Sequence, residues 1–257
     1  MAQWPTILEK RMSDSFSILL VLKDRPAYTK RFLHYLNHIR FPYPIIVADG
    51  GLNKEIQNIL KNTSNFPNLE YEYHHYGYDE TLDDFHNKMS SAINLVQTPL
   101  VSVMDNDDFM LLEGIEKSIR FLKENQDYSS TRGMIQLADI SDNVSGHLSV
   151  GGNMYKKFPN HIDRLTALGR IELQSKCFHG NWHNITRTNH VKACWNMLGI
   201  SKPTNMRFTE QTTGYVNVVF GKGARFDYPW LLHQQADRIE IKDGTLNDHF
   251  PPQESWI

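Results

Sequence analysis

Cysteine is scarce in this chain: Cys177 and Cys194 are the only two among 257 residues. Two cysteines are too few for a disulfide framework, and they lack a Cys-x-x-Cys spacing. We therefore expect both to be reduced residues of the core.

Long hydrophobic runs are also missing. The segment from Met1 to Phe16 contains several charged residues and no sustained apolar stretch. Such a segment is neither a signal peptide nor a transmembrane helix, so we expect a cytoplasmic protein.

The chain has no excess of charge of either sign, with a net charge of -2 and an isoelectric point near 6.6. Without a basic field it should not attract a polyanion over long range, so we expect no nucleic-acid partner. A local basic pocket for one phosphate ligand is compatible with this balance. No Gly-x-Gly-x-x-Gly follows the first expected strand, which disfavours dinucleotide oxidoreductases.

What the chain does have is enough hydrophobic sequence, 40% with 11% aromatic residues, for one large α/β domain or two small ones. Apolar runs and amphipathic stretches alternate up to about Leu122, which is typical of a sheet wrapped by helices. Helices should begin near Pro26, Asn53, Thr81 and after Asp108. The expected strands of this part run from Phe16 to Leu22, Pro44 to Ala48, Leu69 to His74, from Leu100, and Gly133 to Ala138.

The second half is less regular. Glycine and proline interrupt residues 139–170, which should form loops or short strands over the sheet. Order should return with a strand from Arg170 to Lys176, helices from Thr186 to Leu198 and Glu210 to Phe220, and a strand from Ala224 to Trp230.

The most informative segment is the strand that begins at Leu100 and stops at Asp105-Asn106-Asp107-Asp108. Ligands of open α/β sheets bind at the carboxyl ends of the strands. Asp105 and Asp107, two residues apart, can both reach one hard divalent cation. The alternative is a solvated acidic turn that caps the following helix.

Two other expected strands end in polar residues, one in Lys23-Asp24-Arg25 and the other in Asp49-Gly50-Gly51. In a parallel sheet these ends lie along one edge, beside the acidic segment. Together the three segments resemble the nucleotide-sugar-binding half of GT-A glycosyltransferases of the family-2 type, which have a DxD motif. The resemblance covers residues from about Ser17 to Gln234.

The resemblance implies an α/β fold of the GT-A, Rossmann-like type, with a mostly parallel central sheet flanked by helices. Residues 16–244 would form one domain, in which 16–138 bind the nucleotide-sugar and 139–244 form the C-terminal acceptor and catalytic half. Residues 1–15 would be an extension, and 245–257 a polar tail or linker.

The same resemblance assigns donor-binding roles. Asp49 would accept hydrogen bonds from the base or ribose, and Gly50 would let the backbone approach closely, although a tight turn explains the glycines equally well. Lys23, Arg25 and Lys88 would contact the nucleotide; the alternative for Lys88 is an exposed helical lysine. The donor would be a nucleotide-sugar, with a UDP-sugar the leading candidate.

A divalent cation, Mn²⁺ or Mg²⁺, is the implied cofactor, held by Asp105 and Asp107 and by His233. Asp105 and Asn106 would also contact the donor. When a sugar–nucleotide bond breaks, negative charge builds up on the diphosphate, and a cation offsets it. A lone histidine is more often structural, so only the position of His233 after the last strand favours this role.

The resemblance also implies a general base for catalysis, which is one member of an acidic pair at the start of a helix. Here the pair is Glu210-Gln211, so Glu210 is the candidate, against helix N-terminal stabilisation as the alternative. His179 and Trp182 lie where donor sugar and acceptor would meet; Trp182 could equally be a core residue. His179 and His183 are four residues apart, but no third ligand makes a zinc site of them.

We therefore expect an inverting, metal-dependent glycosyltransferase that acts on a hydroxyl of a glycan or lipid-linked acceptor in surface polysaccharide biosynthesis. Peripheral association with the cytoplasmic face of a membrane, and further domains beyond the tail, are compatible with this reading. The alternatives are a catalytically silent GT-A-like nucleotide-binding or assembly domain and a sugar-phosphate nucleotidyltransferase. The latter usually needs a glycine- and Lys/Arg-rich loop after its first strand, which is absent here.

Overall fold

The computed structural model describes residues 15–140, 148–154, 161–176, 178 and 180–234. All but the last residue of the expected N-terminal extension, the whole polar tail at 245–257, Cys177 and His179 lie outside the described residues.

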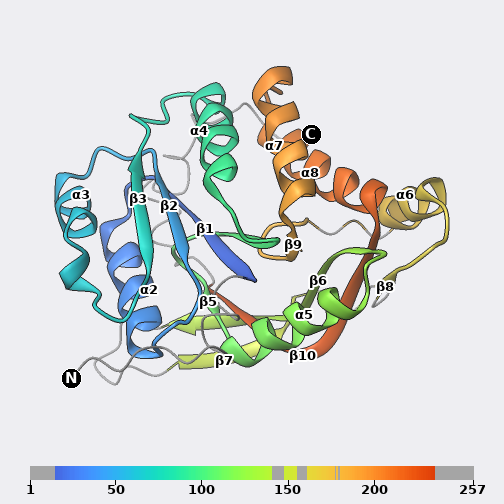
Figure 1. Cartoon of the computed structure of the whole chain (residues 1–257), viewed down its shortest axis with the longest axis horizontal. Coiled ribbons are helices and arrows are strands. Elements are labelled where there is room, and N and C mark those ends of the chain that lie inside the picture. The colour runs from blue at the N-terminus through green and yellow to red at the C-terminus, as the bar shows by residue number, and fades with distance from the viewer. Residues whose placement is uncertain (1–14, 141–147, 155–160, 177, 179, 235–257) are drawn as a thin grey trace.

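The first half of the chain alternates strands and helices, as its sequence predicts (Figure 1). The strands are β1 (Phe16–Leu22), β2 (Ile45–Asp49), β3 (Tyr71–His75), β4 (Leu100–Met104) and β5 (Phe109–Met110). The helices are α2 (Pro26–His38), α3 (Lys54–Lys61), a short 3-10 turn η1 (Thr63–Asn65), α4 (Leu82–Leu95) and α5 (Leu112–Glu124).

Local signals set several of these boundaries. Asn53 caps α3 by accepting the Ile56 N–H at 3.0 Å. Thr81 and Asp84 form the predicted capping box at the start of α4. Pro26 occupies the first turn of α2, where its missing N–H costs nothing.

The second half supplies β6 (Tyr128–Ile140), β7 (Leu148–Asn153), β8 (His161–Ile162), α6 (Ala167–Lys176), β9 (Ile185–Arg187), α7 (Thr188–Ser201), α8 (Met206–Phe220) and β10 (Lys222–Gln234). One sheet runs through the described part of the chain in the order β3-β2-β1-β4-β9-β6-β10-β5, with β7 beside β6 and β8 beside β10. Strands β3, β2, β1, β4, β6 and β10 point one way, while β9 and β5 oppose them, so the sheet is mostly parallel as expected.

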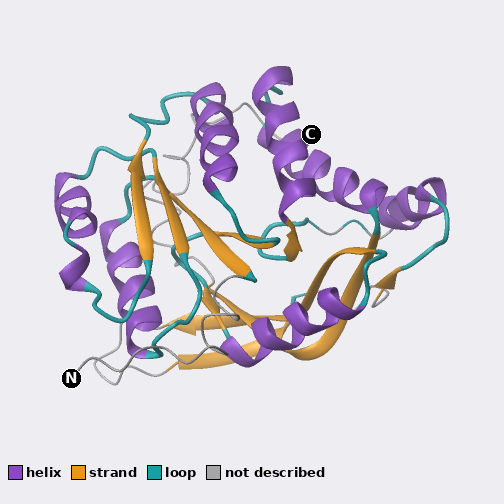
Figure 2. Cartoon of the chain, in the orientation of Figure 1, coloured by secondary structure: helices purple, strands orange, loops and turns teal. Residues whose placement is uncertain are grey.

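Helices cover both faces of the sheet, as Figure 2 shows. Strand β1 is buried throughout, and its side chains alternate between the two faces. Ile18, Leu20 and Leu22 join the core under α2, α3 and α5, whereas Leu19 and Val21 join the core under α4 and α7. A strand buried on both faces reads as a continuous apolar run, which is why its sequence was recognisable.

Four predictions for the second half of the chain were wrong or displaced. Residues 170–176 belong to helix α6, because Arg170 and Gln174, four residues apart, are both buried against the rest of the fold. The helix expected from residue 186 begins at Thr188, after the short strand β9, and the helix expected from residue 210 begins at Met206. Strand β10 extends to Gln234, so His233 lies within it.

Among the described helices, none has the length and apolar character needed to cross a membrane. Cys194 is a buried free thiol, as predicted. Burial raises the pKa of this thiol to about 12, which keeps it in the unreactive protonated form.

Candidate functional site

The carboxyl ends of β1 and β4 open onto a cavity of about 440 Å³. Lys23 and Arg25 line it from the segment after β1, and Lys88 lines it from α4. The whole segment from Asp105 to Asp107 also lines it. The sequence prediction that these polar strand ends meet at one edge of the sheet is consistent with this arrangement, except for Asp49, which is not among the lining residues.

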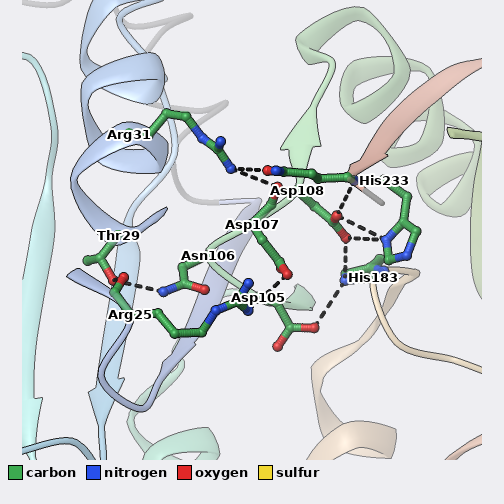
Figure 3. A network of polar contacts seen from close by, with 10 residues as sticks. Arg25, Thr29, Arg31, Asp105, Asn106, Asp107, Asp108, His183 and His233 are labelled. Carbon is green, nitrogen blue, oxygen red and sulfur yellow. Dashed lines mark hydrogen bonds and ion pairs between the residues drawn. The ribbon is translucent and has the colours of Figure 1, made fainter. Parts of the chain in front are cut away.

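The acidic segment is held by α2 (Figure 3). Arg25 Nη1 donates to Asp107 Oδ2 at 2.9 Å, and Asn106 Nδ2 donates to Thr29 Oγ1 at 2.8 Å. Asp105 remains the most open of the three, with 43% of its side chain exposed. The Asp107 carboxylate helps raise the pKa of Arg25 against the opposing effect of burial, so this guanidinium is firmly cationic.

Asp108 is not among the residues that line the cavity, and its side chain contacts two histidines, His183 and His233 (Figure 3). Its side chain is 1% exposed, and its oxygens accept hydrogen bonds from His233 Nδ1 at 3.1 Å and from the Gln234 N–H at 3.1 Å. The hydrogen bond to Asp108 raises the pKa of His233. Asp108 therefore does not cap α5, whose first residue follows Leu111 without a side-chain cap.

His183 lies next to both Asp105 and Asp108. Its Nε2 lies 3.1 Å from Asp108 Oδ2 and 3.5 Å from Asp105 Oδ2, without the geometry of a hydrogen bond. Its backbone has a φ of +68°, a conformation that is uncommon for residues other than glycine. The His183 N–H donates to Val103 O and its carbonyl accepts from Ser102 Oγ, so β4 holds this turn in place.

Asp49 is buried at 2% exposure, and its carboxylate serves the turn itself. Oδ1 accepts the Gly51 N–H at 2.8 Å, and Oδ2 accepts the Tyr73 hydroxyl at 2.7 Å. Burial and this hydrogen bond raise the pKa of Tyr73. Asp49 is therefore not a lining residue of the cavity, and its hydrogen bond to the Gly51 N–H is consistent with a tight turn in this segment.

Lys88 is almost fully buried, so the alternative of an exposed helical lysine is wrong. Its ammonium donates to Leu22 O at 3.0 Å and forms an ion pair with Asp79. The two side chains are 1% and 3% exposed and both line the cavity. Burial lowers the pKa of Lys88 and raises that of Asp79, and the attraction between them opposes both shifts.

A second cavity of about 250 Å³ lies beside the first. Trp182, His183 and Glu210 line both, and His233 and Phe178 line only the second. Trp182 also packs against the core, with its ring centroid 6.0 Å from that of Trp195. Trp182 is thus a core residue that also lines both cavities, and its contact with a sugar stays a prediction.

Glu210 stands one turn inside α8, so stabilisation of the helix start is not its role. The Glu210 side chain is solvent-accessible, but the residues around it partly desolvate its carboxyl and so raise the pKa of that group. The negative charge of Asp105 raises this pKa further. Gln211 lines neither cavity. Of the pair, Glu210 alone lines the cavities and alone carries a carboxylate, and its role as the general base stays a prediction.

Within the described residues, no group of three or more His, Cys, Asp or Glu side chains is arranged to hold a metal ion. Sequence reasoning missed Asp79 entirely and considered His183 only for zinc. The strand-end rule that singled out Asp105 would have found Asp79 as well, because it follows β3.

No protein-family model and no curated protein matches the sequence. Solved structures do match: S. aureus TarS residues 1–349 superimpose with a TM-score of 0.56 at 13% identity, over 94% of this chain and 67% of that one. A longer TarS structure superimposes with a TM-score of 0.55 at 16% identity, over 86% of this chain and 37% of that one. The complex of TarS 1–349 with UDP-GlcNAc superimposes with a TM-score of 0.54 at 16% identity, over 87% of this chain and 59% of that one. TarS is a GT-A-like glycosyltransferase, and the fold of this chain is therefore the GT-A fold.

Proposed function

We propose that the protein is an inverting glycosyltransferase that moves a sugar from a nucleotide-sugar to a hydroxyl of an acceptor. The observation that carries this proposal is that two cavities meet at Glu210, Trp182 and His183. The larger cavity would take the donor and the smaller one the acceptor. A transferase needs both sites to open on one reacting centre.

The chemistry of the larger cavity suits a nucleoside diphosphate. Lys23 and Arg25 supply positive charge for phosphate oxygens at the end of β1. The TarS structures in complex with UDP-GlcNAc and with UDP, TM-scores 0.54 and 0.52, support a UDP-sugar as the first donor to test.

In the proposed step, Glu210 takes the proton of the acceptor hydroxyl as the oxygen attacks the anomeric carbon. The new carbon–oxygen bond forms while the bond to the diphosphate breaks, and the electron pair leaves with the diphosphate. Attack from the side opposite the leaving group inverts the anomeric centre. Trp182 offers an aromatic face to a sugar ring at the junction of the cavities.

A divalent cation fits this site by donor chemistry. Mg²⁺ is commonly bound through one or two carboxylates plus substrate phosphates, so a set of three protein ligands is not required. Asp105, whose side chain is 43% exposed, is the leading ligand. Asp107 would also bind the cation once its ion pair with Arg25 is broken, and His233 would bind it from the smaller cavity. When bound, Mn²⁺ or Mg²⁺ would offset the charge that develops on the diphosphate.

The acceptor class belongs to the same proposal: a glycan or a lipid-linked glycan in surface polysaccharide biosynthesis, at the cytoplasmic face of a membrane. Its carbohydrate would lie in the cavity lined by Phe178, Trp182 and His233. Aromatic faces and polar side chains together suit a sugar ring.

The test is a screen of UDP-, GDP-, dTDP- and CMP-sugars for Mn²⁺-dependent binding and slow donor hydrolysis, with and without EDTA. We expect binding and hydrolysis of at least one donor and their loss on chelation. Binding without turnover would instead identify a silent nucleotide-binding domain. No response to any donor would overturn the proposal.

A further inference from the structure

Large apolar side chains are exposed on three neighbouring helices in the second half of the chain. Helix α8 packs against both α6 and α7 (Figure 1). Among the residues that the structure describes, the four most exposed large apolar side chains lie on or beside these helices: Leu165 at 90%, Ile200 at 85%, Leu168 at 76% and Phe208 at 60%. Single exposed apolar residues are common, but a group of them on adjacent elements marks an interaction surface.

Contacts between the helices join these residues into one region. Arg170 of α6 donates to Leu165 O at 3.0 Å and to Val219 O of α8 at 3.1 Å, so one guanidinium links the two segments. The ring of Phe220, at the end of α8, stacks on His190 of α7 with centroids 4.6 Å apart. We call this region the helical apolar surface. It comprises Leu165, Leu168, Ile200, Phe208, Val219 and Phe220, all of them exposed.

Helix α8 separates this surface from the proposed catalytic junction. Glu210 lines both cavities, whereas Phe208 lines neither. Two residues are about 200° apart around a helix axis, so Phe208 and Glu210 point to opposite sides of α8. Val219, three turns after Phe208, shares its outward face. The Tyr215 ring of α8 lies 5.7 Å from that of Phe178, which lines the smaller cavity, so the surface and that cavity are close neighbours.

The charge around the helical apolar surface is positive. The sequence from 173 to 226 holds seven Lys or Arg residues and a single acidic residue, Glu210, in a chain with a net charge of -2. Arg207 is exposed at the start of α8, beside the apolar surface. Lys202, in the turn before α8, lies 3.4 Å from Asp83, and both partners are well exposed, so the pairing is weak. Glu210 faces the cavities and does not oppose these cations on the outward side.

Exposed apolar side chains bordered by cations have the chemistry of a surface that binds anionic lipids. We propose that the helical apolar surface docks this protein on a bilayer that contains anionic lipids. The apolar side chains enter the boundary between headgroups and acyl chains, and Arg207 and Lys202 meet the lipid phosphates. A lipid-linked acceptor would then reach the smaller cavity past α8; this last step rests on the proposed function.

Flotation of the intact protein with lipid vesicles tests the proposal without any donor. Vesicles of phosphatidylcholine alone are compared with vesicles that contain about one third phosphatidylglycerol. We expect the protein to bind the anionic vesicles at least about tenfold more tightly, and this binding to weaken as the salt concentration rises.

Variants separate the apolar from the charged contribution. The double variant Ile200→Ser with Phe208→Ser should bind anionic vesicles at least about tenfold more weakly, because two apolar side chains no longer enter the bilayer. Arg207→Gln should weaken binding about fivefold. Two matched controls should bind as the wild type does: Leu52→Ser, at an exposed residue between β2 and α3, and Lys123→Gln, at an exposed cation of α5.

Equal binding to both kinds of vesicle, or binding to neither, refutes the proposal, and so does unchanged binding by the double variant. A dimer in sedimentation velocity that the double variant dissociates would show instead that a second copy of the chain covers the surface. None of these results bears on donor hydrolysis, so the proposed function would stand. Vesicle binding by a protein that binds no nucleotide-sugar supports the docking surface and refutes the proposed function.

Discussion

The Lys88→Met variant should lose much of the stability of the fold. Methionine fills nearly the same volume but leaves the Asp79 carboxylate, with a side chain 3% exposed, without its ammonium partner. Breaking a buried pair in this way costs about 3–5 kcal/mol. In a domain of this size about 2–4 °C of melting temperature is lost per kcal/mol, so Tm should fall by about 6–20 °C.

The double variant Lys88→Met with Asp79→Asn separates the charge from the packing. It removes both charges and should recover most of the loss in Tm, because no uncompensated buried charge remains. Thermal unfolding followed by circular dichroism measures all three proteins. A Tm for Lys88→Met within about 2 °C of wild type would refute the reasoning, since the pair would then not be desolvated.

Three further predictions concern the site. Gly50→Ala should destabilise the fold by about 1–3 kcal/mol in a denaturant titration, because its Cβ would overlap the Asp79 carboxylate; unchanged stability would contradict the close approach. Asp105→Asn should abolish the Mn²⁺ dependence of donor binding measured by calorimetry, whereas a dependence equal to wild type would place the cation elsewhere. The transfer rate should be lost as pH falls through the pKa of Glu210, which desolvation raises above the ordinary value of 4.5; an acidic limb at or below 4.5 would exclude Glu210 as the group that titrates.

Much of the fold was predictable because its strands are buried on both faces. The apolar runs of β1, β2 and β4 and the caps of α3 and α4 are local signals, and the structure confirms each of them. Helix α6 was not predictable in this way. Its buried residues are Arg170 and Gln174, which are polar, so their burial depends on partners distant in sequence. Arg170, for example, donates to the carbonyls of Val218 and Val219.

The candidate site, like the fold, was predictable where local sequence decides and not where contacts between distant residues decide. The strand-end rule located the Asp105 segment without reference to any contact, because it depends only on the order of the strands. The direction in which each carboxylate points is a tertiary property. Asp107 faces Arg25, Asp108 turns to His233, and Asp49 serves its own turn, although the three look alike in the sequence.

The central claim is that Glu210 activates the acceptor at the junction of the two cavities, and Glu210→Gln tests it most directly. The amide keeps the size of the side chain but cannot take the acceptor proton. With the donor identified by the screen, transfer should fall about 10²–10⁴-fold while the Kd for the donor changes little. Transfer by Glu210→Gln at the wild-type rate would contradict the account.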